Sequence, residues 1–226
     1  MDEVSEAVYA YYPVFRSTED LRNRPPSDLD SIAHEADILL KEWSERVQVR
    51  GTYSTVGFRP DAELMMWWVA RSPDDIQDLL VAFRRTAFGR RLELTHAFMG
   101  VVRPAEFSKD HRPAFVKGVP PKRFACVYPY VRTIEWYLLP AEERSALLRE
   151  HGELGREFPD VLANTTSAFG LSDWEWILAF ESDDVSRIVD CLRRLRDAKA
   201  RAYTKEEIPF VTGIRKEFVE AARDLA

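Results

Sequence analysis

Cysteine is scarce in this chain, basic residues show no excess, and long apolar runs are absent. Its two cysteines, Cys126 and Cys191, are isolated in the sequence, so they form neither a metal-binding cluster nor a disulfide framework, as expected in a reducing compartment. No apolar stretch approaches the roughly 20 residues that cross a bilayer. The first residues also lack the basic start and apolar core of a signal peptide. We therefore expect a cytoplasmic protein that does not enter a membrane.

The charge balance excludes a second class of protein. The formal net charge is −6, whereas a nucleic-acid-binding protein needs a clear basic excess. The 226 residues are 46% hydrophobic and 31% charged. That composition suffices for one sizeable core or for two smaller packed units.

Two segments look like copies of each other. Each has an apolar run, then a helix that starts with Ser or Asp, then a basic pair. An apolar run that enters a capped helix is common, but a shared register over roughly twenty residues favours duplication over chance. In the aligned segments, Ile76, Leu79, Leu80 and Phe83 match Val185, Ile188, Val189 and Leu192, and Arg84 and Arg85 match Arg193 and Arg194.

Apolar periodicity predicts the same order of elements in both halves. The first half should have strands at 7–15, 47–57, 64–70 and 92–102, and helices at 28–46 and 73–87. The second should have strands at 124–137, 162–169, 174–180 and 210–215, and helices at 141–158 and 183–201. Both halves are βαββαβ, the ferredoxin-like plan. The predicted class is therefore α+β: two ferredoxin-like repeats, at 1–103 and 123–226, that form a dimeric α+β barrel within one chain, with a linker or flap at 104–122.

One histidine lies on the apolar face of the helix predicted at 141–158. A buried imidazole such as that of His151 needs a partner, which is either a backbone carbonyl, as in most core histidines, or an iron. Gly152 and Gly155 favour iron, because they leave a smooth helix surface for a flat ligand at a cost in helix stability of roughly 1 kcal/mol each. The residues that share the face of His151 are Leu147, Leu148 and Leu154.

Three other groups have both an ordinary and a functional interpretation. His111, in the proline-rich linker, is either an exposed loop histidine or an acid–base group on a flap that closes over a bound metal. Tyr128, Tyr130 and Arg132 alternate onto one face of a strand, where aromatic residues usually pack, but where an arginine beside two phenols can bind a carboxylate. The third group is a basic cluster, more often a solvated face than a site, formed by Arg193, Arg194 and Arg196.

These residues resemble a known family. The motif reads Tyr-Pro-Tyr-Val-Arg from Tyr128, Glu-Trp-Tyr-Leu-Leu-Pro-Ala-Glu-Glu-Arg from Glu135, His-Gly-Glu-Leu-Gly-Arg from His151, and Gly-Leu-Ser-Asp-Trp-Glu-Trp from Gly170. This pattern is similar to that of the chlorite dismutase-like superfamily, and within it to the coproheme decarboxylase branch in its actinobacterial form. The resemblance covers essentially the whole chain and agrees with the duplicated ferredoxin-like plan.

The resemblance implies catalytic roles for three residues. His151 would be the proximal ligand of an iron, and Tyr128 would be the tyrosine that is oxidised to a radical. His111 falls where the actinobacterial branch carries a distal histidine, which helps to cleave bound peroxide.

The resemblance also implies a set of residues that bind the cofactor. Arg132 stands where other branches have a lysine and should pair with a propionate, Trp136 would pack near the reacting propionates, and Arg196 matches a propionate-binding arginine. Chlorite dismutases place a distal arginine, and many decarboxylases a glutamine, at a position that is Ala163 here, or Asn164 if a one-residue gap is allowed.

By the same resemblance, the chain would use hydrogen peroxide to decarboxylate propionates 2 and 4 of iron-coproporphyrin III (coproheme) to vinyl groups, giving haem b in the last step of the coproporphyrin-dependent pathway. Coproheme would be both substrate and redox cofactor. A homopentamer and transient contact with coproporphyrin ferrochelatase are implied as well. Two alternatives stay open: a chlorite dismutase-like haem peroxidase, and a non-catalytic haem carrier or sensor. The lack of a distal arginine, together with Tyr128, weighs against chlorite turnover.

Overall fold

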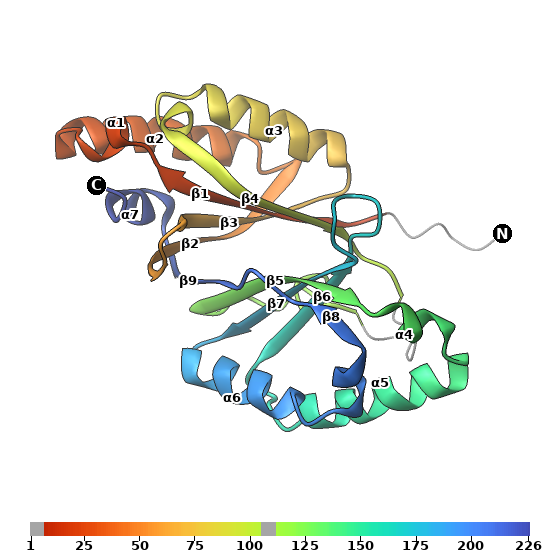
Figure 1. Cartoon of the computed structure of the whole chain (residues 1–226). Coiled ribbons are helices and arrows are strands. Elements are labelled where there is room, and N and C mark those ends of the chain that lie inside the picture. Colours follow the sequence, from red (N-terminus) through yellow and green to blue (C-terminus); the bar gives the residue numbers. More distant parts are fainter. Residues whose placement is uncertain (1–6, 105–111) are drawn as a thin grey trace. The chain divides into compact units, whose positions relative to one another are not determined.

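The computed structural model describes residues 7–104 and 112–226, and the chain forms two compact units (Figure 1). The first unit comprises Met1–Val101 and Val211–Ala226, and the second comprises Val102–Phe210. In each unit, helices cover one face of an antiparallel sheet (Figure 1). This is the predicted α+β arrangement.

The first unit contains the first βαββαβ repeat. Its strands are ordered β4-β1-β3-β2, and β1 pairs antiparallel with both β3 and β4. The helices α2 and α3 pack on one face around a core rich in aromatic residues, in which the rings of Trp68 and Phe83 lie 6.3 Å apart. The elements are β1 (Tyr9–Ser17), α1 (Glu19–Arg22), α2 (Pro26–Glu42), β2 (Val47–Arg59), β3 (Ala62–Ala70), α3 (Pro73–Arg85), the 3-10 turn η1 (Gly89–Arg91), β4 (Leu92–Val101), β9 (Val211–Lys216) and α7 (Phe218–Arg223).

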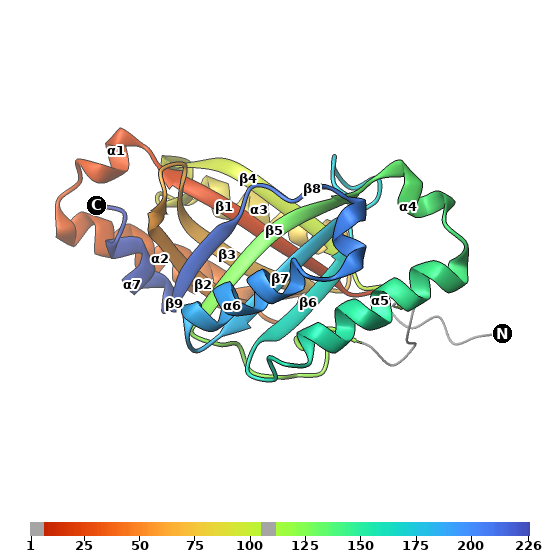
Figure 2. The same cartoon turned by 60° about the horizontal axis from the view of Figure 1, so that its bottom comes forward.

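The second unit contains β5 to β8. Its strands β6, β7 and β5 are antiparallel neighbours, and the short β8 pairs with the end of β5. Figure 2 shows α5 and α6 on one face of these strands. The elements are β5 (Phe124–Arg132), α4 (Ile134–Leu138), α5 (Ala141–Gly155), β6 (Leu162–Ser167), β7 (Trp176–Ser182), α6 (Val185–Leu195), the 3-10 turn η2 (Lys199–Tyr203) and β8 (Thr204–Glu206).

The last strand of the chain belongs with the first unit. The sequence places a strand at 210–215 in the second half, whereas β9 pairs with β2 of the first unit, with Tyr53 opposite Arg215. Gly213 permits this close approach, because a Cβ atom there would lie 2.9 Å from the carbonyl oxygen of Ser54. The helix α7, which the sequence does not predict, continues in the same unit and buries Phe218 in its core.

The strand predicted at 124–137 is too long. β5 ends at Arg132, and a turn leads into α4, which buries Trp136 and leaves Ile134 75% exposed. Aromatic and β-branched residues favour a strand locally, but tertiary contacts end it here. Tyr203 accepts the amide hydrogen of Thr133 through its carbonyl oxygen at 2.9 Å.

The helix predicted at 183–201 is also too long. α6 ends at Leu195, where the amides of Arg196 and Asp197 turn back to carbonyls three residues earlier. The chain then continues as η2, which buries Ala200. No glycine or proline marks this end, so tertiary burial of the small residues after α6 decides it.

The two repeats match with a shift of three residues from the predicted alignment. Both helices start at a side-chain cap: Ser72 accepts the amide of Asp74, and Asp184 accepts that of Ser186. Aligning these caps pairs the buried residues Ile76, Leu79 and Phe83 of α3 with Ile188, Cys191 and Leu195 of α6. Three residues are close to one helical turn, so the apolar pattern alone fits both alignments.

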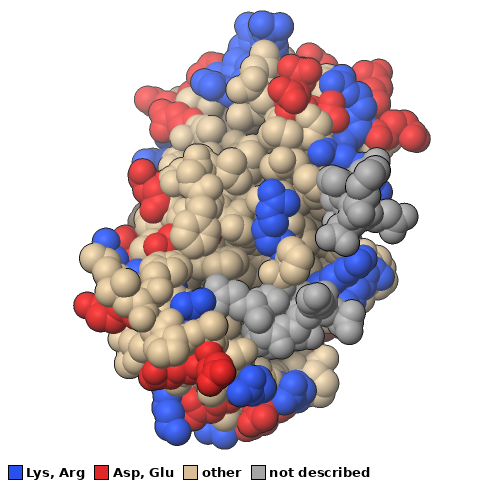
Figure 3. All heavy atoms as spheres, turned by 90° about the vertical axis from the view of Figure 1, so that its right-hand side faces the viewer, with Lys and Arg blue, Asp and Glu red and all other residues tan. Residues whose placement is uncertain are grey.

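Charged side chains of both signs are interspersed on the face shown in Figure 3, in keeping with the modest net charge. Within residues 7–104 and 112–226, no helix is both long enough and apolar enough to span a membrane.

We expect Gly213→Ala to destabilise the protein by about 1–3 kcal/mol, because the added methyl group overpacks the β9–β2 contact. Gly152→Ala is the matched control, since a Cβ atom there meets nothing within 4 Å and alanine favours a helix by up to about 1 kcal/mol. Thermal unfolding of the ligand-free proteins tests this. Equal Tm values for the two variants would contradict the close approach at Gly213.

Candidate haem-binding site

Tyr128 lies in the middle of β5 and is 4% exposed. Its ring packs against Phe210, with centroids 4.3 Å apart, and stacks parallel to Phe180 at 6.1 Å. Burial raises the pKa of the phenol well above its ordinary value, with smaller contributions from Cys126 and Glu207. Among the described residues, the Tyr128 hydroxyl has no hydrogen-bond partner. The site thus holds a neutral phenol whose hydroxyl group is available for a hydrogen bond to a ligand.

Arg132 and Trp136 form one corner of the site, where β5 ends. The guanidinium of Arg132 lies 4.1 Å from the ring centre of Trp136 and 4.8 Å from that of Tyr130. It also donates to the carbonyl oxygen of Ala200 at 3.0 Å. These contacts hold a cation in a defined place beside Tyr128 and Tyr130 on the strand.

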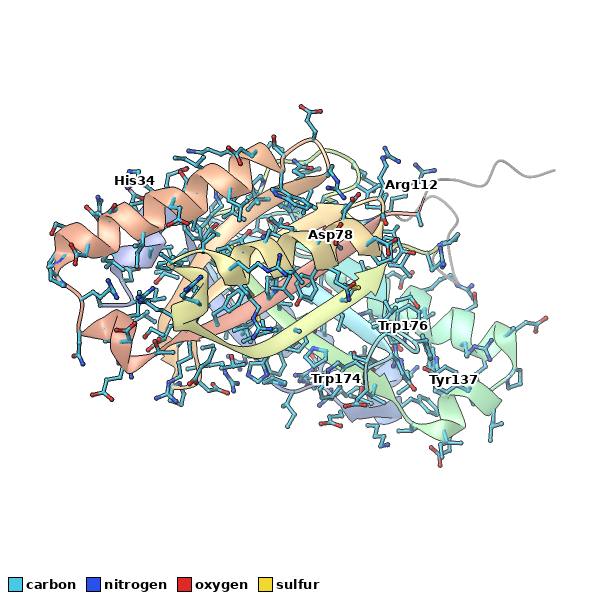
Figure 4. The ribbon with its side chains drawn as sticks, turned by 90° about the horizontal axis from the view of Figure 1, so that it is seen from above. His34, Asp78, Arg112, Tyr137, Trp174 and Trp176 are labelled. Carbon is cyan, nitrogen blue, oxygen red and sulfur yellow. The ribbon has the colours of Figure 1, made fainter. Side chains whose placement is uncertain are left out.

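A glutamate just before β7 supports this corner. The carboxylate of Glu175 accepts the backbone amide of Arg132 at 2.7 Å and the hydroxyl of Tyr137 at 2.6 Å. Tyr137 is in turn close to Phe169, which lies edge-on to Trp176. Figure 4 shows Tyr137 and Trp176 at the same end of the second unit. The sequence analysis did not identify Glu175 as a supporting residue.

His151 lies on α5, on the face turned toward the sheet. Leu154, which shares that face, packs against the core formed by Tyr128, Phe180 and their neighbours. All 15 residues of α5 are nevertheless at least partly exposed. The His151 imidazole makes no hydrogen bond to the described residues. Its pKa is lowered by burial and, to a smaller degree, by the positive charge of Arg132. A neutral ring nitrogen is therefore available for an iron.

The strand register places the two candidates of β6 on opposite faces of the sheet. Ala163 is opposite Phe180, which is opposite Cys126, so Ala163 lies on the face of the sheet that α5 and α6 cover. Asn164 points to the other face, where it is buried, accepts the amide of Phe115 at 3.0 Å and donates to the carbonyl oxygen of Ala179 at 3.1 Å.

The helix-covered face is open near β6. Ala163 and Thr165 are exposed there, Leu178 is half-buried, and α5 lies on the same side without burying any residue. An exposed stretch of sheet surface, one unpartnered imidazole and one unpartnered phenol therefore occur together among the described residues of the second unit. These features fit an iron porphyrin, which would supply a metal for the imidazole and an oxidant for the phenol.

Arg196 lies just beyond α6 and is engaged with the protein itself. Its guanidinium donates to Oε2 of Glu207 at 3.1 Å and also pairs with Oε1. Arg201 donates to Oε2 of the same carboxylate at 2.6 Å. Arg196 carries a signal in the sequence, but Arg201 and Glu207 do not, because they come near the site only through the pairing of β8 with β5.

The structure brings most of the predicted site residues into one unit, but not all of them can be placed. Tyr128, Arg132, Trp136 and His151 surround the helix-covered face of the second sheet, as described above. His111 lies outside the described residues. Its role therefore stays a prediction from the sequence.

Comparisons with known proteins show the family to which the chain belongs. A family profile described as chlorite dismutase matches residues 30–216. A coproheme decarboxylase of Mycolicibacterium smegmatis is 47% identical over 190 residues, covering 83% of this chain and 82% of that protein. A coproheme decarboxylase of Thermus thermophilus is 29% identical, covering 77% and 76%.

The structural comparison gives the same answer for the fold. The chlorite dismutase of Candidatus Nitrospira defluvii in complex with imidazole superposes with a TM-score of 0.87, at 23% identity, over 96% of this chain and 94% of that one. The predicted α+β fold with two ferredoxin-like repeats is thereby confirmed. The chain belongs to the chlorite dismutase family.

We expect the His151 imidazole of the ligand-free protein to titrate below the usual value of 6.5, because burial disfavours its charged form. The unfolded chain then binds more protons than the folded one as the pH falls below 6.5, so acidification costs stability. NMR titration of the ring protons, assigned with His151→Gln, measures the pKa. Arg132→Gln should raise it only part of the way, since burial remains. A value above 6.5 in the wild type would contradict the buried, unpartnered ring.

Proposed function

We propose that this protein is a coproheme decarboxylase, which converts propionates 2 and 4 of iron-coproporphyrin III to vinyl groups with hydrogen peroxide and so produces haem b. The supporting observation is the pairing of an unpartnered imidazole, His151, with an unpartnered buried phenol, Tyr128, on one open face of the second unit. The 47% identity to the Mycolicibacterium enzyme supports the same substrate.

The residues present suit a porphyrin with acidic side chains. His151 would hold the iron, and the exposed surface of β6 with Ala163 would lie against the ring. Arg132 is held over Trp136 and Tyr130, where its remaining donors can receive a propionate. The iron porphyrin, when activated by peroxide, supplies the oxidising power of the reaction.

Tyr128 carries out the step that the protein itself provides. Its raised pKa keeps the phenol protonated, so oxidation removes an electron and a proton together and leaves a neutral phenoxyl radical. That radical takes a hydrogen atom from the β-carbon of the adjacent propionate, which restores the phenol. The propionate radical then loses carbon dioxide and gives its remaining electron to the second oxidising equivalent of the peroxide. Overall, one propionic acid and one hydrogen peroxide give one vinyl group, one carbon dioxide and two waters. The second propionate requires the same sequence once more.

The other groups have supporting roles. His111 would move the proton that peroxide cleavage requires, and Ala163, on the covered face of the sheet, leaves room above the ring. Both buried cysteines are free thiols, which fits action in the cytoplasm. Assembly as a homopentamer and a transient contact with coproporphyrin ferrochelatase belong to the same proposal and rest on the family resemblance.

One alternative is a chlorite dismutase-like haem peroxidase, which the fold match to chlorite dismutases favours. Such an enzyme would release oxygen from chlorite at a high rate, and Tyr128 would not be needed. A non-catalytic haem carrier or sensor would bind the porphyrin and leave its mass unchanged. The reaction product therefore separates the three functions.

We expect the wild-type protein, mixed with ferric coproheme and peroxide, to yield a porphyrin that has lost two carbon dioxide molecules, as measured by mass spectrometry. Tyr128→Phe should bind coproheme and form no vinyl product, because phenylalanine has no hydroxyl group and cannot form the phenoxyl radical. Tyr9→Phe, which removes a hydroxyl in the first unit, is the control and should react like the wild type. Vinyl formation by Tyr128→Phe at the wild-type rate would exclude the radical role.

A further inference from the structure

The Glu207 carboxylate has both of its oxygens bound by arginine. Arg196 contacts Oε1 and Oε2, and Arg201 contacts Oε2. The Glu207 side chain is only 12% exposed, whereas those of Arg196 and Arg201 are 40% and 36% exposed. The acid thus lies inside, between two cations that reach toward solvent. Two-point contact between a guanidinium and a carboxylate is the geometry by which proteins also bind carboxylate ligands.

This cluster lies beside the reactive phenol. β8 pairs with the end of β5, with Val131 opposite Glu206, so the segment that follows runs along the strand that carries Tyr128. Phe210, three residues after Glu207, packs on the Tyr128 ring with centroids 4.3 Å apart. The charges of Glu207 and Arg196 both act on the Tyr128 phenol, one raising its pKa and the other lowering it.

We propose that Glu207 occupies the carboxylate-binding groups of Arg196 and Arg201 when no substrate is present, and that it is exchanged for the propionate that Tyr128 attacks. The inference rests on the proposed function, because it requires a porphyrin propionate at this place. The exchange replaces one carboxylate by another, so the two arginines keep a counter-ion throughout, and no covalent bond changes.

This exchange distinguishes substrate from product. A bound propionate displaces Glu207, but the vinyl group that replaces it has no charge and cannot pair with an arginine. Glu207 then returns to Arg196 and Arg201. Coproheme, with four carboxylates, must therefore compete with Glu207 for the two arginines. Haem b has lost the carboxylate that displaced Glu207, so the return of Glu207 favours its release.

The test compares the affinities of ferric coproheme and haem b, measured by absorbance titration without peroxide so that no turnover occurs. In Glu207→Gln, the competitor is lost, and we expect coproheme to bind about tenfold more tightly, which corresponds to about 1.4 kcal/mol. Haem b should change less than twofold. Glu206→Gln, the control, removes the same charge one residue away and should leave the ratio of the two affinities as in the wild type.

The arginines provide a second test. In a background of Arg196→Gln and Arg201→Gln, removal of Glu207 should no longer change the ratio, because the groups for which it competes are absent. If Glu207→Gln alone unfolds, the substitution can still be made in this background, because both arginines that it would leave unpaired are absent. Thermal unfolding shows which variants are folded.

Several results would count against the inference. An equal change in affinity for both porphyrins, or weaker coproheme binding by Glu207→Gln, means that Glu207 only supports the structure. An effect of the same size from Glu206→Gln means that general charge, and not exchange, is responsible. Failure of the wild type to bind either porphyrin would overturn the proposed function itself, whereas normal binding with an unchanged ratio overturns the exchange alone.

Discussion

The second unit depends on a helix, α5, that lies over the sheet without fully burying any of its own residues. α6 buries Ile188, Cys191 and Leu195 against the sheet, as a helix of this fold should, whereas its neighbour α5 buries nothing completely. Because the leucines of α5 stay partly in contact with water, the unit lacks the burial free energy of roughly 25 cal/mol per Å² of that apolar surface. A ligand that completes the packing recovers this energy, and the histidine on that face gives the ligand a point of attachment.

Charge in the second unit is arranged so that the two buried ionisable groups are neutral and the arginines near them are more exposed. Burial keeps the imidazole of His151 and the phenol of Tyr128 neutral. Arg132, Arg196 and Arg201 lie near them, and each is restrained by an aromatic ring, a backbone carbonyl or a carboxylate. The arrangement suits a ligand that is flat and apolar in its centre and acidic at its edge.

Much of the fold follows from apolar periodicity, and the errors have identifiable causes. The strands and helices of both repeats occur where the pattern predicts them, but the ends of β5 and α6 are decided by contacts with Tyr203 and by burial of Ala200, which no local signal encodes. The repeat alignment differs by three residues because the apolar pattern repeats at almost that interval. The location of β9 depends on its long-range pairing with β2, which the close approach of Gly213 to Ser54 permits.

In the candidate site, too, some residues are marked by the local sequence and others only by long-range contacts. His151 could be identified because a histidine on an apolar helix face is unusual, and Tyr128 because it shares a strand face with an arginine. Only the register of β6 against β7 shows that Ala163, and not Asn164, lies on the helix-covered face of the sheet. Glu207 and Arg201 were missed because they approach Tyr128 from a segment far along the chain.

The central claim is that a porphyrin iron binds to His151 in the second unit, and an absorption spectrum tests it most directly. Adding ferric coproheme to the wild-type protein should produce the spectrum of an imidazole-bound haem. His151→Ala should lack it, while His34→Ala, which changes an exposed histidine on α2 of the first unit (Figure 4), should retain it. The same spectrum from the wild type and His151→Ala would contradict the account.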